Sequence, residues 1–105
     1  MYMAEVPLFL LEVQNYKSLS LSLDGKKNLQ HQKFVEIVKD FVLPGSRYEI
    51  NISEWDRRHI LHIYDIEAFR WLELPSVERH SIFNLAEKEM IKILGSSRLS
   101  QHCSL

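Results

Sequence analysis

The first quarter of the chain has a hydrophobic pattern that predicts a pair of strands. Residues 6–13 form a nearly continuous apolar run, which we interpret as a strand buried on both faces, with Pro7 near its start. Residues 17–23 alternate between leucine and polar residues, the period of two that is typical of a half-buried strand. Asp24 and Gly25 then supply turn residues. We expect the two strands to form a hairpin.

A helix is predicted next, because the apolar positions change to a helical period. Phe34, Ile37, Val38 and Phe41 fall at i, i+3, i+4 and i+7, which places them on one helix face. Asn28 is a candidate N-cap, and Pro44 disfavours helical geometry in the residue before it. We therefore expect a helix that starts after Asn28 and ends near Leu43.

The second half of the chain predicts one short strand and two further helices. Residues 48–52 alternate as a strand, and Ser53 is placed to cap a helix that runs to about Ala68. Residues 69–74 fit either a helix or a strand, and Pro75 ends either one. Ser76 is expected to cap the last helix, with Gly95 as its C-terminal stop.

Together these elements predict an α/β fold of the α+β kind. A small sheet of three or four short strands is packed by about three helices, in the order β-β-α-β-α-(β)-α. Residues 1–95 are expected to form a single globular domain, and the polar residues 96–105 a flexible C-terminal tail.

Composition adds few constraints. The chain has 105 residues and a formal net charge of −1, which disfavours a strongly electrostatic nucleic-acid binder. Cys103 is the single cysteine, so the fold is not held by a disulfide. No run reaches the roughly 20 apolar residues that a membrane helix needs. We therefore expect no membrane partner and a cytoplasmic or nuclear location.

Motifs for catalysis are not evident, and we expect a non-enzymatic protein without a cofactor. The three glycines, 25, 45 and 95, are isolated, so they do not form a phosphate-binding loop. His59 and His62 lie three residues apart on a predicted helix, with Asp56 and Asp65 at the same spacing on either side. Two histidines and a carboxylate can bind a divalent metal. Because His-x-x-His is a common accidental spacing, we predict no metal site.

Arginine and aromatic residues gather between residues 55 and 79. Arginines contact phosphates and aromatic rings stack on bases, so this composition is typical of single-stranded nucleic-acid binding. The candidate residues are Arg57, Arg58, Arg70, Arg79 and, as a stacking platform, Trp71. Acidic residues are interspersed among them. Surface ion pairs and a buried aromatic core would explain the same residues.

Residues 74–88, with the sequence LPSVERHSIFNLAEK, resemble the centre of the R-3-H domain, which is named for Arg-x-x-x-His. The match includes a proline, a serine cap, Glu-Arg and Leu-Ala-Glu, but the diagnostic histidine is replaced by Phe83. The resemblance implies single-stranded nucleic-acid binding through Arg79. It also implies a fold in which a few helices pack against a small sheet.

We therefore predict a domain that binds single-stranded RNA or DNA weakly, in the R-3-H manner. The alternative is a non-catalytic protein-interaction or oligomerisation module, in which residues 6–13 form an edge strand that pairs with another protein or a second copy. Salt dependence separates the two, because phosphate contacts weaken steeply with salt and an apolar interface does not.

Overall fold

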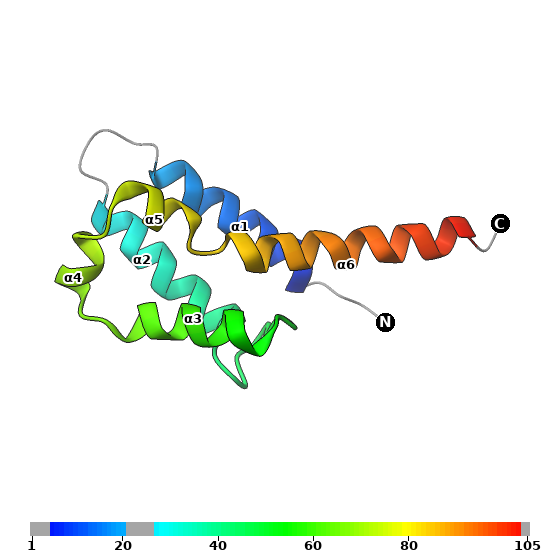
Figure 1. The fold of residues 1–105 in the computed structure, drawn as a ribbon, viewed down its shortest axis with the longest axis horizontal. Coiled ribbons are helices and arrows are strands. Elements are labelled where there is room, and N and C mark those ends of the chain that lie inside the picture. The colour runs from blue at the N-terminus through cyan, green and yellow to red at the C-terminus, as the bar shows by residue number, and fades with distance from the viewer. Residues whose placement is uncertain (1–4, 21–26, 104–105) are drawn as a thin grey trace.

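The computed structural model describes residues 5–20 and 27–103, and every regular element within these ranges is a helix (Figure 1). The predicted α/β fold is therefore wrong: this part of the chain is all-α. In chain order the elements are α1 (Glu5–Ser20), α2 (Lys27–Ile37), the π-helical turn η1 (Val38–Val42), α3 (Glu54–Asp65), α4 (Ala68–Leu72), α5 (Ser76–Ser81) and α6 (Asn84–Cys103).

Helix α1 replaces the hairpin that was predicted at the start of the chain. Val6, Phe9, Val13 and Tyr16 are buried at i, i+3, i+7 and i+10, which is a helical stripe. A short apolar run fits a buried strand or a buried helix equally well by pattern alone. Pro7 lies in the first turn, where its missing N–H costs no hydrogen bond. Of the leucine–serine alternation, residues 21–23 lie outside the described residues, as does the predicted turn at 24–25.

The helix predicted around Phe41 is confirmed. Its stripe, Phe34, Ile37, Val38 and Phe41, is buried throughout. The helix is described from Lys27, so Asn28 lies inside it rather than capping it. Helix α2 passes into η1, where the backbone N–H of Leu43 donates to the carbonyl of Val38 at 2.9 Å. The chain then leaves the helix before Pro44, as predicted.

The predicted strand at residues 48–52 is an irregular segment that pairs with η1. The N–H of Tyr48 donates to the carbonyl of Asp40, and that of Ile50 to the carbonyl of Phe41, both at 2.9 Å. These bonds satisfy backbone carbonyls near the end of the helix. Gly45 makes the preceding turn with φ at +78°, a conformation that favours glycine.

Helix α3 begins at the predicted cap, since the Ser53 hydroxyl accepts a hydrogen bond from the N–H of Asp56 at 3.2 Å. It ends at Asp65, earlier than the expected Ala68, and the segment left open between helix and strand contains helix α4.

The last predicted helix is two helices, and it does not stop at Gly95. Ser76 is the first helical residue of α5 rather than its cap, because Pro75 occupies the N-cap position. Ile82 and Phe83 interrupt the helix before α6. Gly95 lacks the positive φ of a helix stop, and α6 continues to Cys103. Residues 96–103 are thus part of this helix, and 104–105 lie outside the described residues. The flexible tail expected for residues 96–105 stays a prediction.

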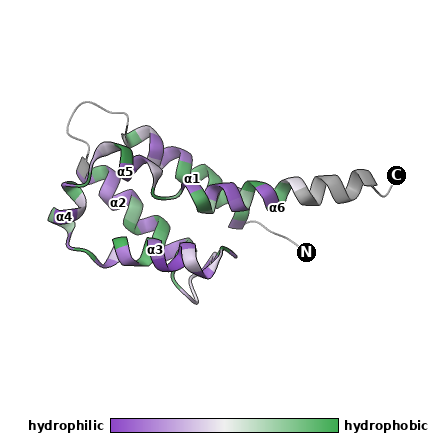
Figure 2. Cartoon of the chain, in the orientation of Figure 1, coloured by the Kyte–Doolittle hydropathy of each residue, from purple (hydrophilic) through white to green (hydrophobic). Residues whose placement is uncertain are grey.

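The centre of the core is a cluster of aromatic rings from α1, α2, η1 and the turn between α5 and α6. The Phe83 ring centroid lies 5.2 Å from that of Tyr16 and 5.7 Å from that of Phe34, and Phe9 lies 5.5 Å from Phe41. Apolar bands recur along α1, α2 and α6, with hydrophilic bands between them (Figure 2).

The closely packed helix pairs are α1–α2, α1–α5, α1–α6, α2–α4 and η1–α3. Helix α3 therefore rests mainly on η1, while α6 projects beyond the other helices (Figure 1). In the part of the chain that the structure describes, no helix is long and apolar enough to cross a bilayer.

Candidate functional site

Arg79 is the central residue of the predicted nucleic-acid site, which requires a side chain that faces solvent. In the structure it is buried. Its side chain donates to the Gln30 side-chain oxygen at 3.2 Å and to the backbone carbonyls of Leu72 and Leu74 at 3.4 and 2.5 Å. The backbone carbonyl of Arg79 accepts a hydrogen bond from the Tyr16 hydroxyl. Arg79 thus joins α1, α2 and the α4–α5 connection. The fold itself therefore explains why an arginine stands at this position.

Trp71, the predicted stacking platform, is completely buried and cannot reach a base in this fold. Its ring lies 4.9 Å from the ring of His31 and 5.5 Å from that of Phe34. Burial lowers the pKa of His31. Phe83, at the position of the diagnostic R-3-H histidine, is also fully buried. Packing accounts for both residues, and the family resemblance stays a prediction.

The remaining predicted arginines do not form one surface with Arg79. Arg57 donates to the carbonyls of Val42 and Ile50. Arg58 is exposed and pairs with Glu54 at 3.3 Å on its own helix. Arg70 is exposed on α4, with its guanidinium 6.0 Å from the Phe69 ring centroid. Of the five candidates, the structure leaves only Arg58 and Arg70 open to solvent.

A groove lies between α3 and α5, which do not pack closely on each other. We call it the α3–α5 groove. Its volume is about 400 Å³, and its lining is mostly apolar. The lining residues are His59, His62, Ile63 and Ile66 from α3 and its C-cap, with Leu74, Glu78, Ser81 and Ile82 from the facing segment.

The two walls of the groove follow each other in the chain and are connected through α4. Ile66 and Leu74 both line it near the short connection through α4. At the other end, the backbone N–H of Ser53 donates to the carboxylate of Glu89 at 3.2 Å. Helix α4 therefore connects the two walls, and the Ser53–Glu89 contact joins the start of α3 to α6.

Aromatic and acidic groups mark the α3–α6 end. Trp55 is 67% exposed, and its ring stacks on the His59 ring at 5.8 Å with an interplanar angle of 5°. Asp56 is buried, and its carboxylate oxygens have no hydrogen-bond partner among the described residues. Burial raises the pKa of Asp56, the nearby Glu89 raises it further, and His59 opposes the shift.

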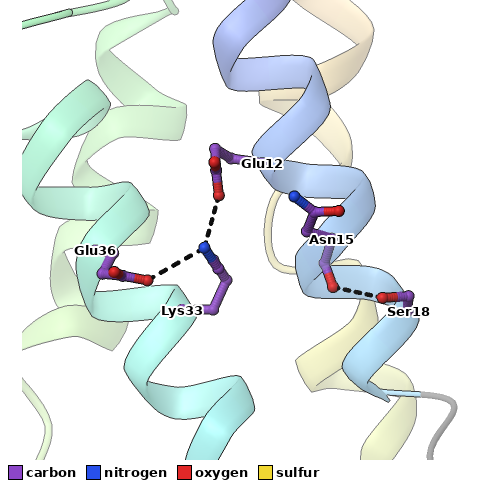
Figure 3. A network of polar contacts seen from close by, with 5 residues as sticks. All are labelled: Glu12, Asn15, Ser18, Lys33 and Glu36. Atoms are coloured by element: carbon purple, nitrogen blue, oxygen red, sulfur yellow. Dashed lines mark hydrogen bonds and ion pairs between the residues drawn. The ribbon is translucent and has the colours of Figure 1, made fainter.

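A second, smaller hollow of about 200 Å³ lies between α1 and α2. Lys33 spans its rim and forms ion pairs with Glu12 at 2.8 Å and Glu36 at 3.2 Å (Figure 3). The hydrogen bond to Glu12 is the main cause of the raised pKa of Lys33. Because these charges already compensate one another, the network is best explained as a link between the two helices.

A metal centre is not supported by the histidine pair. His59 and His62 both line the α3–α5 groove, as their spacing on one helix face requires. Across residues 5–20 and 27–103, no three histidine, cysteine, aspartate or glutamate residues are grouped so that they could hold a metal ion. The arrangement offers apolar contact and a few polar groups at the rim, which is the chemistry of binding.

The groove was missed from the sequence because it depends on how the chain folds back after α4, which no local pattern reveals. The available signals were weak: Trp55 and His59 are four residues apart, and Ile63 and Ile66 continue the same helix face. A helix that runs from Ser53 to about Ala68 would place Leu61, Tyr64 and Ala68 on one face. In the structure the fully buried hydrophobic residue of α3 is Ile60, Leu61 and Tyr64 are half-buried, and Ala68 lies in α4.

Comparison of the chain with protein-family models, curated proteins and solved structures finds no match. The function is therefore argued from the geometry of the molecule.

Proposed function

We propose that this domain is a non-catalytic protein-interaction module that binds an apolar helical segment of another protein in the α3–α5 groove. The observation that carries the proposal is the apolar lining of this groove by Ile63, Ile66, Leu74 and Ile82. An amphipathic helix that lays its apolar face into a groove between helices is a recurrent mode of recognition.

The size of the groove suits this mode. An engineered cavity of about 150 Å³ holds a benzene ring. A groove of about 400 Å³ thus has room for two or three leucine-sized side chains. Such a contact is small, so we expect weak binding in the micromolar range.

Pairing through an edge strand, as the sequence suggested, is not the mode that we propose, because residues 6–13 are helical. The groove also supports single-stranded nucleic acid less well than a peptide. Its lining has one carboxylate, Glu78, and no arginine or lysine to contact a phosphate. Because Arg58 and Arg70 are exposed and could contact phosphates, nucleic-acid binding is included as an outcome of the test.

The test uses a synthetic helical peptide of alanine and glutamine, with leucines at i, i+3, i+4 and i+7 and blocked ends. We expect micromolar binding that changes little with salt. Ile66→Ser should weaken binding about tenfold, because it removes an apolar contact worth roughly 1–2 kcal/mol. Leu11→Ser is the matched control, since Leu11 is 57% exposed on α1, outside the groove.

Equal loss in the two variants, or no binding to the wild type, would contradict the proposal. A labelled single-stranded oligonucleotide, titrated at two salt concentrations, is the second arm. If it binds with a steep salt dependence while the peptide does not, nucleic-acid binding is the better account. Concentration-dependent sedimentation of the domain alone, lost in Ile66→Ser, would assign the groove to a second copy.

A further inference from the structure

The α3–α6 end of the groove carries two carboxylates without a basic partner. Glu89 reaches from α6 and accepts the N–H of Ser53 at the start of α3. Asp56, one turn into α3, is 1% exposed. None of the ion pairs formed by described residues provides either carboxylate with a lysine or arginine. A buried carboxylate is costly when it is unpaired.

The two carboxylates act on each other. Glu89 is close enough to raise the pKa of Asp56, and His59 is the one described group that opposes it. Lys88 and Lys92, the lysines of α6 that flank Glu89 in sequence, are exposed. They form no ion pair with the described residues. Neither carboxylate is therefore paired with a lysine or arginine of the described residues.

The same end presents an aromatic surface to solvent. Trp55 is exposed and lies flat against His59, which lines the groove. A tryptophan face attracts a lysine or arginine, and the aliphatic part of such a side chain packs on the ring. On α3 the groove lining thus begins at His59, next to an exposed tryptophan and to the Asp56–Glu89 pair of carboxylates.

Building on the proposed function, we infer that the helical segment bound by the α3–α5 groove carries a lysine or arginine, which contacts the carboxylate of Glu89 beside Trp55. The apolar residues of the segment fill the groove, and its basic residue lies at the α3–α6 end. The partly exposed Glu89 makes the direct contact.

The experiment compares three forms of the leucine peptide. One turn beyond each end of the leucine stripe, the peptide carries glutamine, lysine or glutamate, so that either binding direction is covered. Affinity is measured at low salt by calorimetry. We expect the lysine peptide to bind about tenfold tighter than the glutamine peptide, the size of a typical charge-assisted contact. The glutamate peptide should bind more weakly than either.

Glu89→Gln tests the assignment, because an amide oxygen can still accept the N–H of Ser53. In this variant the preference for lysine should be lost, while affinity for the glutamine peptide stays unchanged. Glu36→Gln removes the same charge from α2, where the side chain is 63% exposed, and should keep the preference.

The outcomes separate the inference from the proposed function. If the glutamine peptide does not bind the wild type, the groove is not a helix-binding site. If it binds but lysine gives no advantage, the groove binds helices without recognising a basic residue. If the advantage survives in Glu89→Gln, a group other than Glu89 recognises the basic residue. Either result for lysine overturns the inference and leaves the proposed function standing.

Discussion

Arg79 shows how a charged side chain in this domain is used for structure. It is buried, yet the groups that accept its hydrogen bonds are the neutral oxygens of Gln30, Leu72 and Leu74. An arginine can satisfy several carbonyls at once because its planar group has five N–H donors. The buried Tyr16 hydroxyl, whose pKa is raised by burial, completes the cluster by donating to the Arg79 carbonyl.

Arg79→Ala should lower the free energy of unfolding by about 2–4 kcal/mol, because it leaves buried carbonyls and Gln30 without donors. Arg58→Ala, at a side chain that is 80% exposed, should change it by less than about 0.5 kcal/mol. Urea denaturation measures both. Equal, small effects would mean that Arg79 faces solvent, as the sequence suggested.

Asp56→Asn should stabilise the domain at neutral pH. Because the pKa of Asp56 is raised in the fold by burial and by Glu89, the fold favours the protonated acid. The contribution of Asp56 to stability is therefore fully present below the ordinary aspartate pKa of about 3.9 and is lost as pH rises through the folded value. His59, which opposes the shift, reduces the effect without changing its sign.

Thermal unfolding between pH 4 and pH 8 checks this expectation. The stability of Asp56→Asn relative to the wild type should be greatest at the upper end and should shrink toward pH 4. An Asn variant that is less stable than the wild type at pH 8 would show that the carboxylate has a favourable partner.

At the scale of elements, periodicity identified the helices whose apolar residues repeat over two turns and failed where the pattern was short. The stripe from Phe34 to Phe41 fits a helix and does not fit the period of a strand. The helix predicted from it was confirmed. The apolar run at residues 6–13 fits both a strand and a helix, and its partner elements decide between them. Tyr48 and Ile50 alternate as in a strand but bond to η1, which no local pattern reveals.

Glycine substitutions distinguish a helix end from a helix interior. Gly95 lies inside α6, and a methyl group added there would meet no atom within 4 Å, so Gly95→Ala should stabilise the domain by about 0.5–1 kcal/mol. Gly45→Ala should instead destabilise it by about 1 kcal/mol, because φ is +78° at that turn. Denaturant midpoints of both variants test this. A destabilised Gly95→Ala would indicate that α6 ends at Gly95.

At the scale of the whole molecule, the proposed site depends on the tertiary arrangement. Ile63 and Ile66 oppose Leu74 and Ile82 because α3 rests on η1 while α5 packs on α1. From the sequence, His59 and His62 of this region were considered only as metal ligands, and not as part of a binding groove. It could not show that Arg57 and Arg79 point inward while Arg58 and Arg70 do not, since a buried arginine and an exposed one have the same local pattern. With a net charge of −1, long-range attraction contributes little, and contact at the groove must supply the affinity.

The most direct test of the proposed binding site is methyl NMR of isoleucine-labelled domain, titrated with the neutral leucine peptide. Ile63, Ile66 and Ile82 line the groove, Ile91 is an exposed isoleucine of α6, and Ile37 is buried in the core. We predict that saturable shifts are confined to the three groove isoleucines. Shifts at Ile91 without shifts in the groove, or no shifts up to millimolar peptide, would contradict the account.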